Sequence, residues 1–106
     1  MGYLDENDLD GFDWDEGNSY KSFLDHGVTN DEAEQVFSNR PFYTYRDAIH
    51  SESEDRKIIM GKTDKGKAVL VSFTLRGRKV RPISSRFMGR RDRKKFNEAT
   101  QGNTKI

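Results

Sequence analysis

Cysteine is absent from this chain of 106 residues, which excludes disulfide bonds and thiolate metal ligands. Histidine is scarce as well, and His26 and His50 lie far apart in the sequence. A zinc site therefore has few nitrogen ligands available to it. We expect a protein that uses neither a metal ion nor a cofactor.

Long apolar runs are also missing. Only 32% of the residues are hydrophobic, so a domain of this length has a small core in which aromatic side chains carry much of the buried area. No apolar run approaches the roughly 18 residues of a membrane span, and the first residues lack the basic flank and apolar core of a secretion signal. We expect a cytoplasmic protein that does not contact a membrane.

Charge, in contrast, is abundant and unevenly distributed. Residues 1–38 hold eleven acids and one base, whereas residues 39–106 hold seven acids and eighteen bases. Between Arg76 and Lys95, ten cationic side chains face one acid, Asp92. Such density is typical of proteins that bind phosphates, and nucleic acid is the first candidate partner. The acidic half either covers the basic half within the fold or discourages nonspecific association.

The N-terminal half predicts two short helices. Tyr20, Phe23 and Leu24 recur at helical spacing before Gly27, which suits the residue after a helix end. Thr29 and Glu32 form a Thr-x-x-Glu capping box that begins a second helix, and Pro41 prevents its continuation. We expect a flexible acidic segment over 1–11, one domain over 12–100 and a frayed tail over 101–106.

From Phe42 onward the pattern changes to strands. Aromatic and β-branched runs predict four of them, over 42–45, 58–60, 67–75 and 79–86, with glycine at the tight turns of an antiparallel meander. Pro82 places the last strand at an edge or beside a bulge. A helix over 90–99, with Phe96 on its apolar side, completes an α+β fold with two N-terminal helices, a four-stranded mainly antiparallel sheet and a C-terminal helix.

Three segments could carry chemistry, and each has a simpler interpretation. The segment from His50 to Arg56 groups an imidazole, carboxylates and a guanidinium, or is a solvated loop. Alternation puts Lys79 and Arg81 on one strand face and Arg78 and Val80 on the other, which suits a phosphate track or an edge strand protected by charge. Ser84 to Arg93 brings hydroxyls and guanidiniums to the first helical turn, or is a solubilising surface.

The aromatic residues of the N-terminal half could stack on bases, but a chain with so few aliphatic residues needs them in its core. We therefore expect Trp14, Tyr20, Phe23 and Phe37 to be buried.

Many of these residues together resemble one family, the BrnT toxins of bacterial type II toxin-antitoxin systems, over roughly residues 12–97. The matching positions are Phe12 to Asp15, His26 to Thr29, Glu32, Ala33, Val36, Phe37, His50, Glu54, Arg56, Gly61, Gly66, Thr74 to Gly77, Arg81, Ile83, Ser84 and Arg86. The family favours a glutamate at Asp92, an aliphatic residue at Pro82 and a tyrosine at Phe96. The resemblance implies a RelE-like fold, ribonuclease activity, and a BrnA-type antitoxin that binds the operator DNA of the shared operon.

Charge and resemblance together predict metal-independent RNA cleavage by attack of the ribose 2′-hydroxyl on the adjacent phosphorus. The candidate catalytic residues are His50, Glu54, Arg56, Arg81 and Arg86, with His50 or Glu54 moving protons and the arginines balancing charge. The candidate RNA-binding residues are Arg76, Arg78, Lys79, Arg90, Arg91 and Arg93. The partners are an RNA substrate and the antitoxin, with operator DNA reached only through the antitoxin. The alternative is a degenerate toxin, a module that binds nucleic acid or antitoxin without cleaving RNA.

Overall fold

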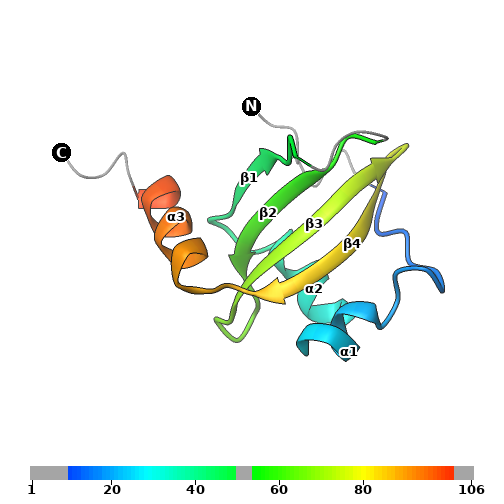
Figure 1. Ribbon diagram of the computed structural model, residues 1–106, viewed down its shortest axis with the longest axis horizontal. Helices are drawn as coiled ribbons and strands as arrows, with labels where there is room; N and C mark the ends of the chain where they lie inside the picture. Colours follow the sequence, from blue (N-terminus) through cyan, green and yellow to red (C-terminus); the bar gives the residue numbers. More distant parts are fainter. Residues whose placement is uncertain (1–9, 50–53, 102–106) are drawn as a thin grey trace.

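The computed structural model describes residues 10–49 and 54–101 of the chain. Seven elements follow in the order α1 (Lys21–His26), α2 (Asn30–Val36), β1 (Tyr43–Arg46), β2 (Lys57–Lys62), β3 (Ala68–Arg76), β4 (Lys79–Phe87) and α3 (Arg90–Gln101) (Figure 1). This is the α+β order that the sequence predicts, and it is compatible with a RelE-like arrangement. No helix among the described residues is both long and apolar enough to cross a membrane.

The four strands form one antiparallel meander in the order β1-β2-β3-β4. The two tight turns that join β2 to β3 and β3 to β4 contain Gly66 at φ 83° and Gly77 at φ 62°, in the left-handed region that favours glycine. Strand β3 lies between two neighbours, and its Val69, Leu70 and Val71 are all buried. Strand β3 is therefore a central strand whose side chains are covered on both faces.

Strand β4 is the last strand of the sheet and contains an irregularity beside Pro82. Ser72 of β3 faces Ser84, whereas the next residue, Phe73, faces Pro82, so β4 holds one extra residue at Ile83. Both expectations for proline, an edge position and a bulge, are met because Pro82 has no N–H for a ladder bond.

The N-terminal segment covers the start of this edge. Phe12 bridges to Val80 in parallel, the Val80 N–H donates to the Gly11 carbonyl at 2.9 Å, and the Asp13 N–H donates to the Val80 carbonyl at 2.8 Å. The Asp10 N–H donates to the Arg78 carbonyl in the same way. Among the described residues, backbone pairing with β4 therefore already includes Asp10, which lies in the segment that the sequence assigns to a flexible lead-in.

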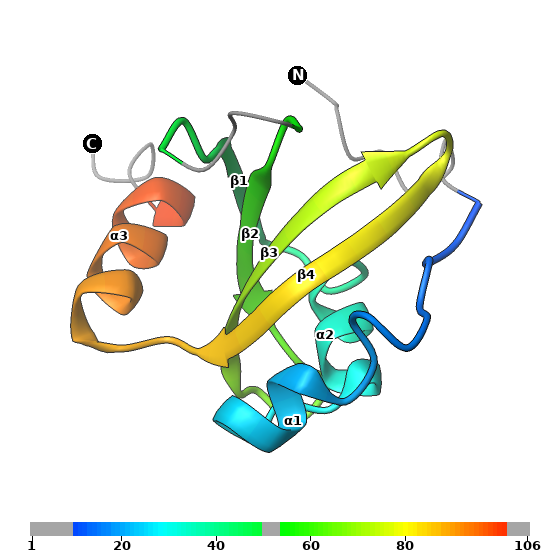
Figure 2. The same ribbon diagram turned by 45° about the vertical axis from the view of Figure 1, so that its right-hand side comes forward.

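The two sheet faces carry different helices (Figure 2). One face packs against α2 and holds the larger core, in which Ile59, Val71 and Phe73 are fully buried beside Val36 and Phe37. The other face carries α3, whose Phe96 packs with Ile58, Met60, Leu70 and Met88. We call the latter the α3 face; α3 contacts it mainly at β1 and β2, away from β4.

Both N-terminal helices begin and end as predicted, but α1 turns its apolar side outward. The capping box of α2 is present, with the Thr29 hydroxyl accepting from the Glu32 N–H at 3.1 Å. In α1, Ser22 faces the sheet, and its hydroxyl oxygen accepts a 2.7 Å bond from the Ser85 N–H.

The expectation that all four N-terminal aromatics are buried is wrong for two of them. Tyr20 is 70% exposed and Phe23 is 52% exposed, whereas Phe37 is buried and Trp14 packs partly buried against the core. The reason is the direction in which α1 faces: the Ser22 contact with Ser85 directs Ser22 to the sheet and leaves the opposite stripe in solvent.

Candidate functional site

Strand pairing puts several of the predicted cations on the α3 face. Leu70 pairs with Arg86, Thr74 with Arg81 and Arg76 with Lys79, so these side chains share the side of the sheet that carries α3. Val80, between Lys79 and Arg81, is fully buried on the opposite face. The predicted alternation along this strand is confirmed.

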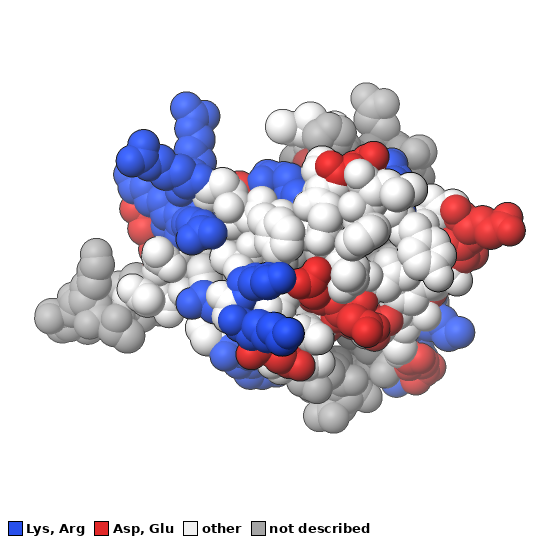
Figure 3. Space-filling view, turned by 90° about the horizontal axis from the view of Figure 1, so that it is seen from below, with Lys and Arg blue, Asp and Glu red and all other residues white. Residues whose placement is uncertain are grey.

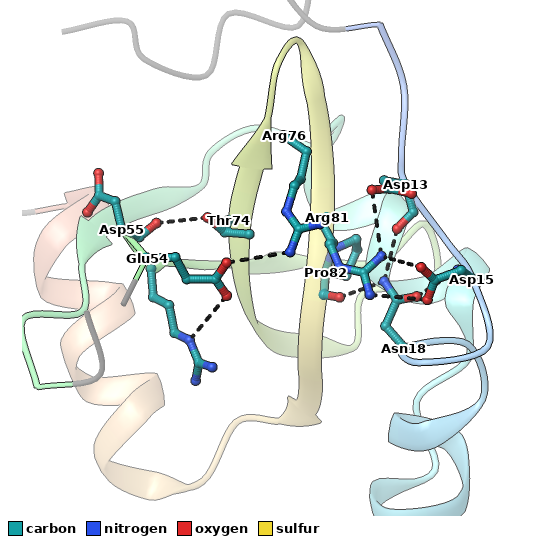
Figure 4. Close-up of polar contacts among 10 residues, drawn as sticks. Asp13, Asp15, Asn18, Glu54, Asp55, Thr74, Arg76, Arg81 and Pro82 are labelled. Carbon is teal, nitrogen blue, oxygen red and sulfur yellow. Dashed lines mark hydrogen bonds and ion pairs between the residues drawn. The ribbon is translucent and has the colours of Figure 1, made fainter. Parts of the chain in front are cut away.

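The first group on this face consists of Glu54, Arg56 and Arg76 (Figure 4). A Glu54 carboxylate oxygen lies 3.9 Å from Arg56 Nε, and its other oxygen lies 3.6 Å from Arg76 Nη2. The Thr74 hydroxyl donates a 3.0 Å bond to the Asp55 carbonyl, which ties the segment before β2 to β3. A carboxylate is thereby held between two guanidiniums at the end of the sheet where β2 begins.

The second group is centred on Arg81 and involves the N-terminal segment. Arg81 Nη1 and Nη2 donate to the two Asp15 oxygens at 3.0 Å and 3.1 Å, and an Asp13 oxygen lies 3.6 Å from Nη1. These hydrogen bonds lower the pKa of the Asp15 carboxyl and raise the pKa of the Arg81 guanidinium. A phosphate that approached Arg81 would have to displace a bidentate carboxylate.

Asn18 holds this second group in place. Its Nδ2 donates to the Asp13 carbonyl at 2.9 Å and to the Pro82 carbonyl at 2.8 Å, and its Oδ1 accepts from the Asp15 N–H at 2.8 Å. The side chain is 6% exposed, so it uses these partners in place of water. One amide therefore joins the N-terminal segment to the middle of β4.

The third group lies where β4 leads into α3. Arg86 forms an ion pair with Asp92, and the Gly89 N–H donates to the same carboxylate at 2.9 Å. The hydrogen bond from Arg86 is the main reason that the pKa of Asp92 is lowered. Arg86 therefore does lie at the first turn of α3, as predicted, but a carboxylate of the chain already occupies its guanidinium.

The remaining predicted residues are more dispersed. Arg78 lies at the β3–β4 turn and pairs with Asp10 at 3.1 Å, and Lys79 is exposed at the start of β4. Arg90, Arg91 and Arg93 are exposed on the first turn of α3. His50 lies outside the described residues. The structure thus brings the candidates onto a shared face in three separate groups, and it does not bring them into one pocket.

Charge remains segregated across the molecule. In Figure 3 one group of Lys and Arg side chains lies at the α3 end and another lies near the middle of the view, whereas most Asp and Glu side chains lie from the middle toward the other end. Where the two meet, Asp10, Asp13 and Asp15 pair with Arg78 and Arg81, so part of the acidic half does cover part of the basic half. Asn18 and Asp15 were not among the predicted site residues, and the opposite charge of the two halves was the only sequence signal for such a contact.

Three residues that depart from the pattern of the resembled family, Asp92, Pro82 and Phe96, have defined places in the structure. Asp92 pairs with Arg86, the Pro82 carbonyl accepts from Asn18, and Phe96 is 4% exposed in the core beneath α3. Phe96 carries no hydroxyl, so it supplies no hydrogen-bonding group to the α3 face.

Metal ligands do not converge within residues 10–49 and 54–101, where no group of three or more histidine, aspartate or glutamate side chains is arranged to hold an ion. The three groups described above present guanidiniums, carboxylates, the Thr74 hydroxyl and the Asn18 amide.

Comparison with known proteins identifies the family. No curated protein matches the chain. Residues 14–92 match the model of a protein family described as the ribonuclease toxin BrnT of type II toxin-antitoxin systems. The match covers both N-terminal helices, the whole sheet and the first turn of α3. The chain belongs to this family of ribonuclease toxins.

Proposed function

We propose that this toxin is an endoribonuclease that cleaves RNA on its α3 face without a metal ion, by attack of the ribose 2′-hydroxyl on the neighbouring phosphorus. The observation that carries the proposal is Glu54, which lies between Arg56 and Arg76 at 3.9 Å and 3.6 Å. A carboxylate is a proton acceptor, and flanking guanidiniums are the preferred partners of a phosphate. The three side chains therefore supply both parts of the reaction.

In the proposed reaction, Glu54 takes the proton of the 2′-hydroxyl, and the 2′-oxygen forms a bond to phosphorus. The bond from phosphorus to the 5′-oxygen breaks, and the leaving oxygen takes up a proton. The products are a 2′,3′-cyclic phosphate and a 5′-hydroxyl. His50 is the candidate for the second proton transfer, because histidine titrates near neutral pH.

The guanidiniums stabilise the extra negative charge of the pentacoordinate state. Arg56 and Arg76 are nearest to the carboxylate, whereas Arg86, whose partner Leu70 lies six residues from Arg76 along β3, would contact another phosphate of the RNA. Removing one well-placed donor costs about 3 kcal/mol, or roughly 100-fold in rate. Arg81 takes part only after its guanidinium exchanges Asp15 for a phosphate, so we assign it a smaller share.

The cations of β4 and α3 then hold the RNA on either side of the cut. Lys79 and Arg78 lie at one end of β4, and the first turn of α3 lies beyond the other. Contacts of this kind neutralise phosphates and release counterions, so binding should weaken steeply as salt concentration rises.

The test is cleavage of a defined single-stranded RNA in EDTA, with the ends identified by mass spectrometry. We expect cyclic phosphate ends, and a loss of at least about 100-fold in kcat for Glu54→Gln and Arg56→Ala. Glu98→Gln and Arg40→Ala are the matched controls, because both residues are exposed and lie outside the three groups. Unchanged cleavage by Glu54→Gln would refute the assignment.

A binding module without chemistry is the second candidate. The observation in its favour is that Asp15 and Asp92 already occupy Arg81 and Arg86. Such a degenerate toxin would bind RNA tightly and in a salt-sensitive way yet leave it intact in the same assay.

Family membership implies a protein antitoxin as partner. We propose that it is of the BrnA type, and that the toxin reaches operator DNA only through it. A mobility-shift assay checks this point, since the toxin alone should leave operator DNA unshifted at physiological salt while the complex shifts it.

A further inference from the structure

Helix α1 presents the most exposed apolar surface of the described chain. Phe23 and Leu24 of α1 and Tyr20, the residue just before the helix, are 52%, 79% and 70% exposed. No residue of α1 is buried. A short helix is normally held on its domain by burying its apolar side chains. Because α1 exposes its largest apolar side chains to solvent, this surface is a candidate contact site for a binding partner.

The surface beside this stripe is hollowed. One hollow of about 430 Å³ is lined by Tyr20, Phe23, Thr29, Asn30 and Asp31. A second, of about 480 Å³, continues past Phe23 and Gly27 toward the β2–β3 turn. The Phe87 ring, 38% exposed, lies beside Gly27, since a Cβ added at that glycine would be 3.8 Å from it. We call this continuous region, with its two hollows, the α1 patch.

Acidic side chains border the α1 patch. Asp25 and Asp31 are exposed, and neither forms an ion pair with any other residue of the described ranges. Figure 3 looks onto this end of the molecule, where Asp and Glu side chains and a group of Lys and Arg side chains border an uncharged surface. Two lysines, Lys65 and Lys67, line the second hollow, and Lys67 pairs with Glu32 at 3.2 Å. Acids still outnumber cations around the patch, with Asp25, Asp31, Glu32 and Asp64 against the two lysines, so an occupant should bring apolar groups together with positive charge.

That requirement discriminates among occupants. A second copy of the chain, bound through a two-fold axis, would bring Asp25 and Asp31 of both copies toward each other, which like charge opposes. RNA and an anionic membrane surface are repelled by the same carboxylates. A protein segment with apolar side chains flanked by lysine or arginine satisfies both features.

We propose that the α1 patch is the docking site for the antitoxin, and that the docking segment is an amphipathic helix whose apolar side enters the hollows while flanking cations meet Asp25 and Asp31. The inference rests on the proposed function only for the existence of a protein antitoxin. Because α1 lies beside α2, on the side of the sheet away from α3 (Figure 2), docking here is separate from the RNA-binding groups.

The test measures binding of the fluorescein-labelled antitoxin encoded with this toxin, by fluorescence anisotropy. Leu24→Glu should raise Kd at least tenfold, and the double variant Asp25→Lys, Asp31→Lys should raise it at least fivefold and reduce its dependence on salt. The matched control is Ile49→Glu, since Ile49 is also apolar and 81% exposed but lies outside the patch; its Kd should stay within twofold. Binding of both patch variants within twofold of the unchanged protein would overturn the proposal.

Two further measurements, light scattering and RNA cleavage without antitoxin, distinguish a wrong docking site from a wrong ribonuclease mechanism. If light scattering finds a dimer that Leu24→Glu dissociates, the patch belongs to a second copy and the proposal falls. RNA cleavage without antitoxin should be the same for Leu24→Glu and the unchanged protein, because the patch is apart from the α3 face. A protein that cleaves no RNA yet binds antitoxin through the patch leaves this inference standing and removes only the ribonuclease mechanism. If Leu24→Glu does not fold, the affinity of the double variant Asp25→Lys, Asp31→Lys for the antitoxin tests the proposal in its place.

Discussion

Replacing Asn18 by alanine tests how the N-terminal segment is held on the sheet. The change removes three hydrogen bonds, to the Asp13 carbonyl, the Pro82 carbonyl and the Asp15 N–H, at a side chain that is only 6% exposed. At about 1 kcal/mol for each bond, the expected loss is about 3 kcal/mol in the free energy of unfolding. That is a large fraction of the stability of roughly 5–15 kcal/mol that is usual for domains.

The loss is measured by urea denaturation followed by circular dichroism. With a slope of about 1.5 kcal/mol per molar urea, the midpoint should fall by about 2 M. Asn18→Asp should lose at least as much, because a carboxylate cannot donate to the two carbonyls and repels them. Asn97→Ala is the control, since Asn97 is exposed on α3, and its change should stay within about 0.5 kcal/mol. A loss below about 1 kcal/mol for Asn18→Ala would show that water replaces the amide and would refute the reasoning.

Three other measurements probe the core, the acid response and RNA binding. Gly61→Ala should destabilise the fold by about 1–3 kcal/mol in the same denaturation assay, because its Cβ would lie 3.0 Å from Val36 Cγ1 and 3.3 Å from the Val36 carbonyl oxygen; unchanged stability would mean that α2 moves away freely. Arg86 lowers the pKa of the Asp92 carboxyl in the folded protein. The ionised carboxylate therefore stabilises the fold at pH values above the ordinary aspartate pKa of the unfolded chain, about 4. This stabilisation is lost as the pH falls below about 4 and through the lowered pKa of the folded state. Urea midpoints should fall over that range, and less so in Asp92→Asn; equal acid sensitivity of the two proteins would contradict the assignment. Arg76→Ala should reduce the slope of log affinity for RNA against log salt by about one, whereas an unchanged slope would remove Arg76 from the phosphate contacts.

Local signals in the sequence were sufficient for most of the secondary structure. The Thr29–Glu32 box and Gly27 fix helix ends through contacts between near neighbours, and alternation along β4 decides which face Arg81 shares with Lys79. Pro82 marks the edge strand because it lacks one backbone donor. Such features depend on a few adjacent residues, so they can be read before the fold is known.

The contacts that define the site could not be predicted in this way. Asp15 and Arg81 are 66 positions apart, and any of several acids in the first half could have paired with any of the later arginines. The helical spacing of Tyr20 and Phe23 identifies a stripe, but the direction in which it faces is set by the distant contact of Ser22 with Ser85. These outcomes depend on tertiary packing, which local patterns do not determine.

The parallel bridge between Phe12 and Val80 has a consequence for shortened forms of this toxin. An outermost strand offers unsatisfied amide and carbonyl groups to any other chain, and residues 10–13 occupy those groups at the start of β4. Deleting the chain up to residue 13 would remove Asp13 from beside Arg81 but leave the bidentate contact with Asp15, and it would expose the edge backbone of β4 to neighbouring molecules. Residues 10–13 therefore protect the fold against aggregation, and trimming them is a poor route to a more active ribonuclease.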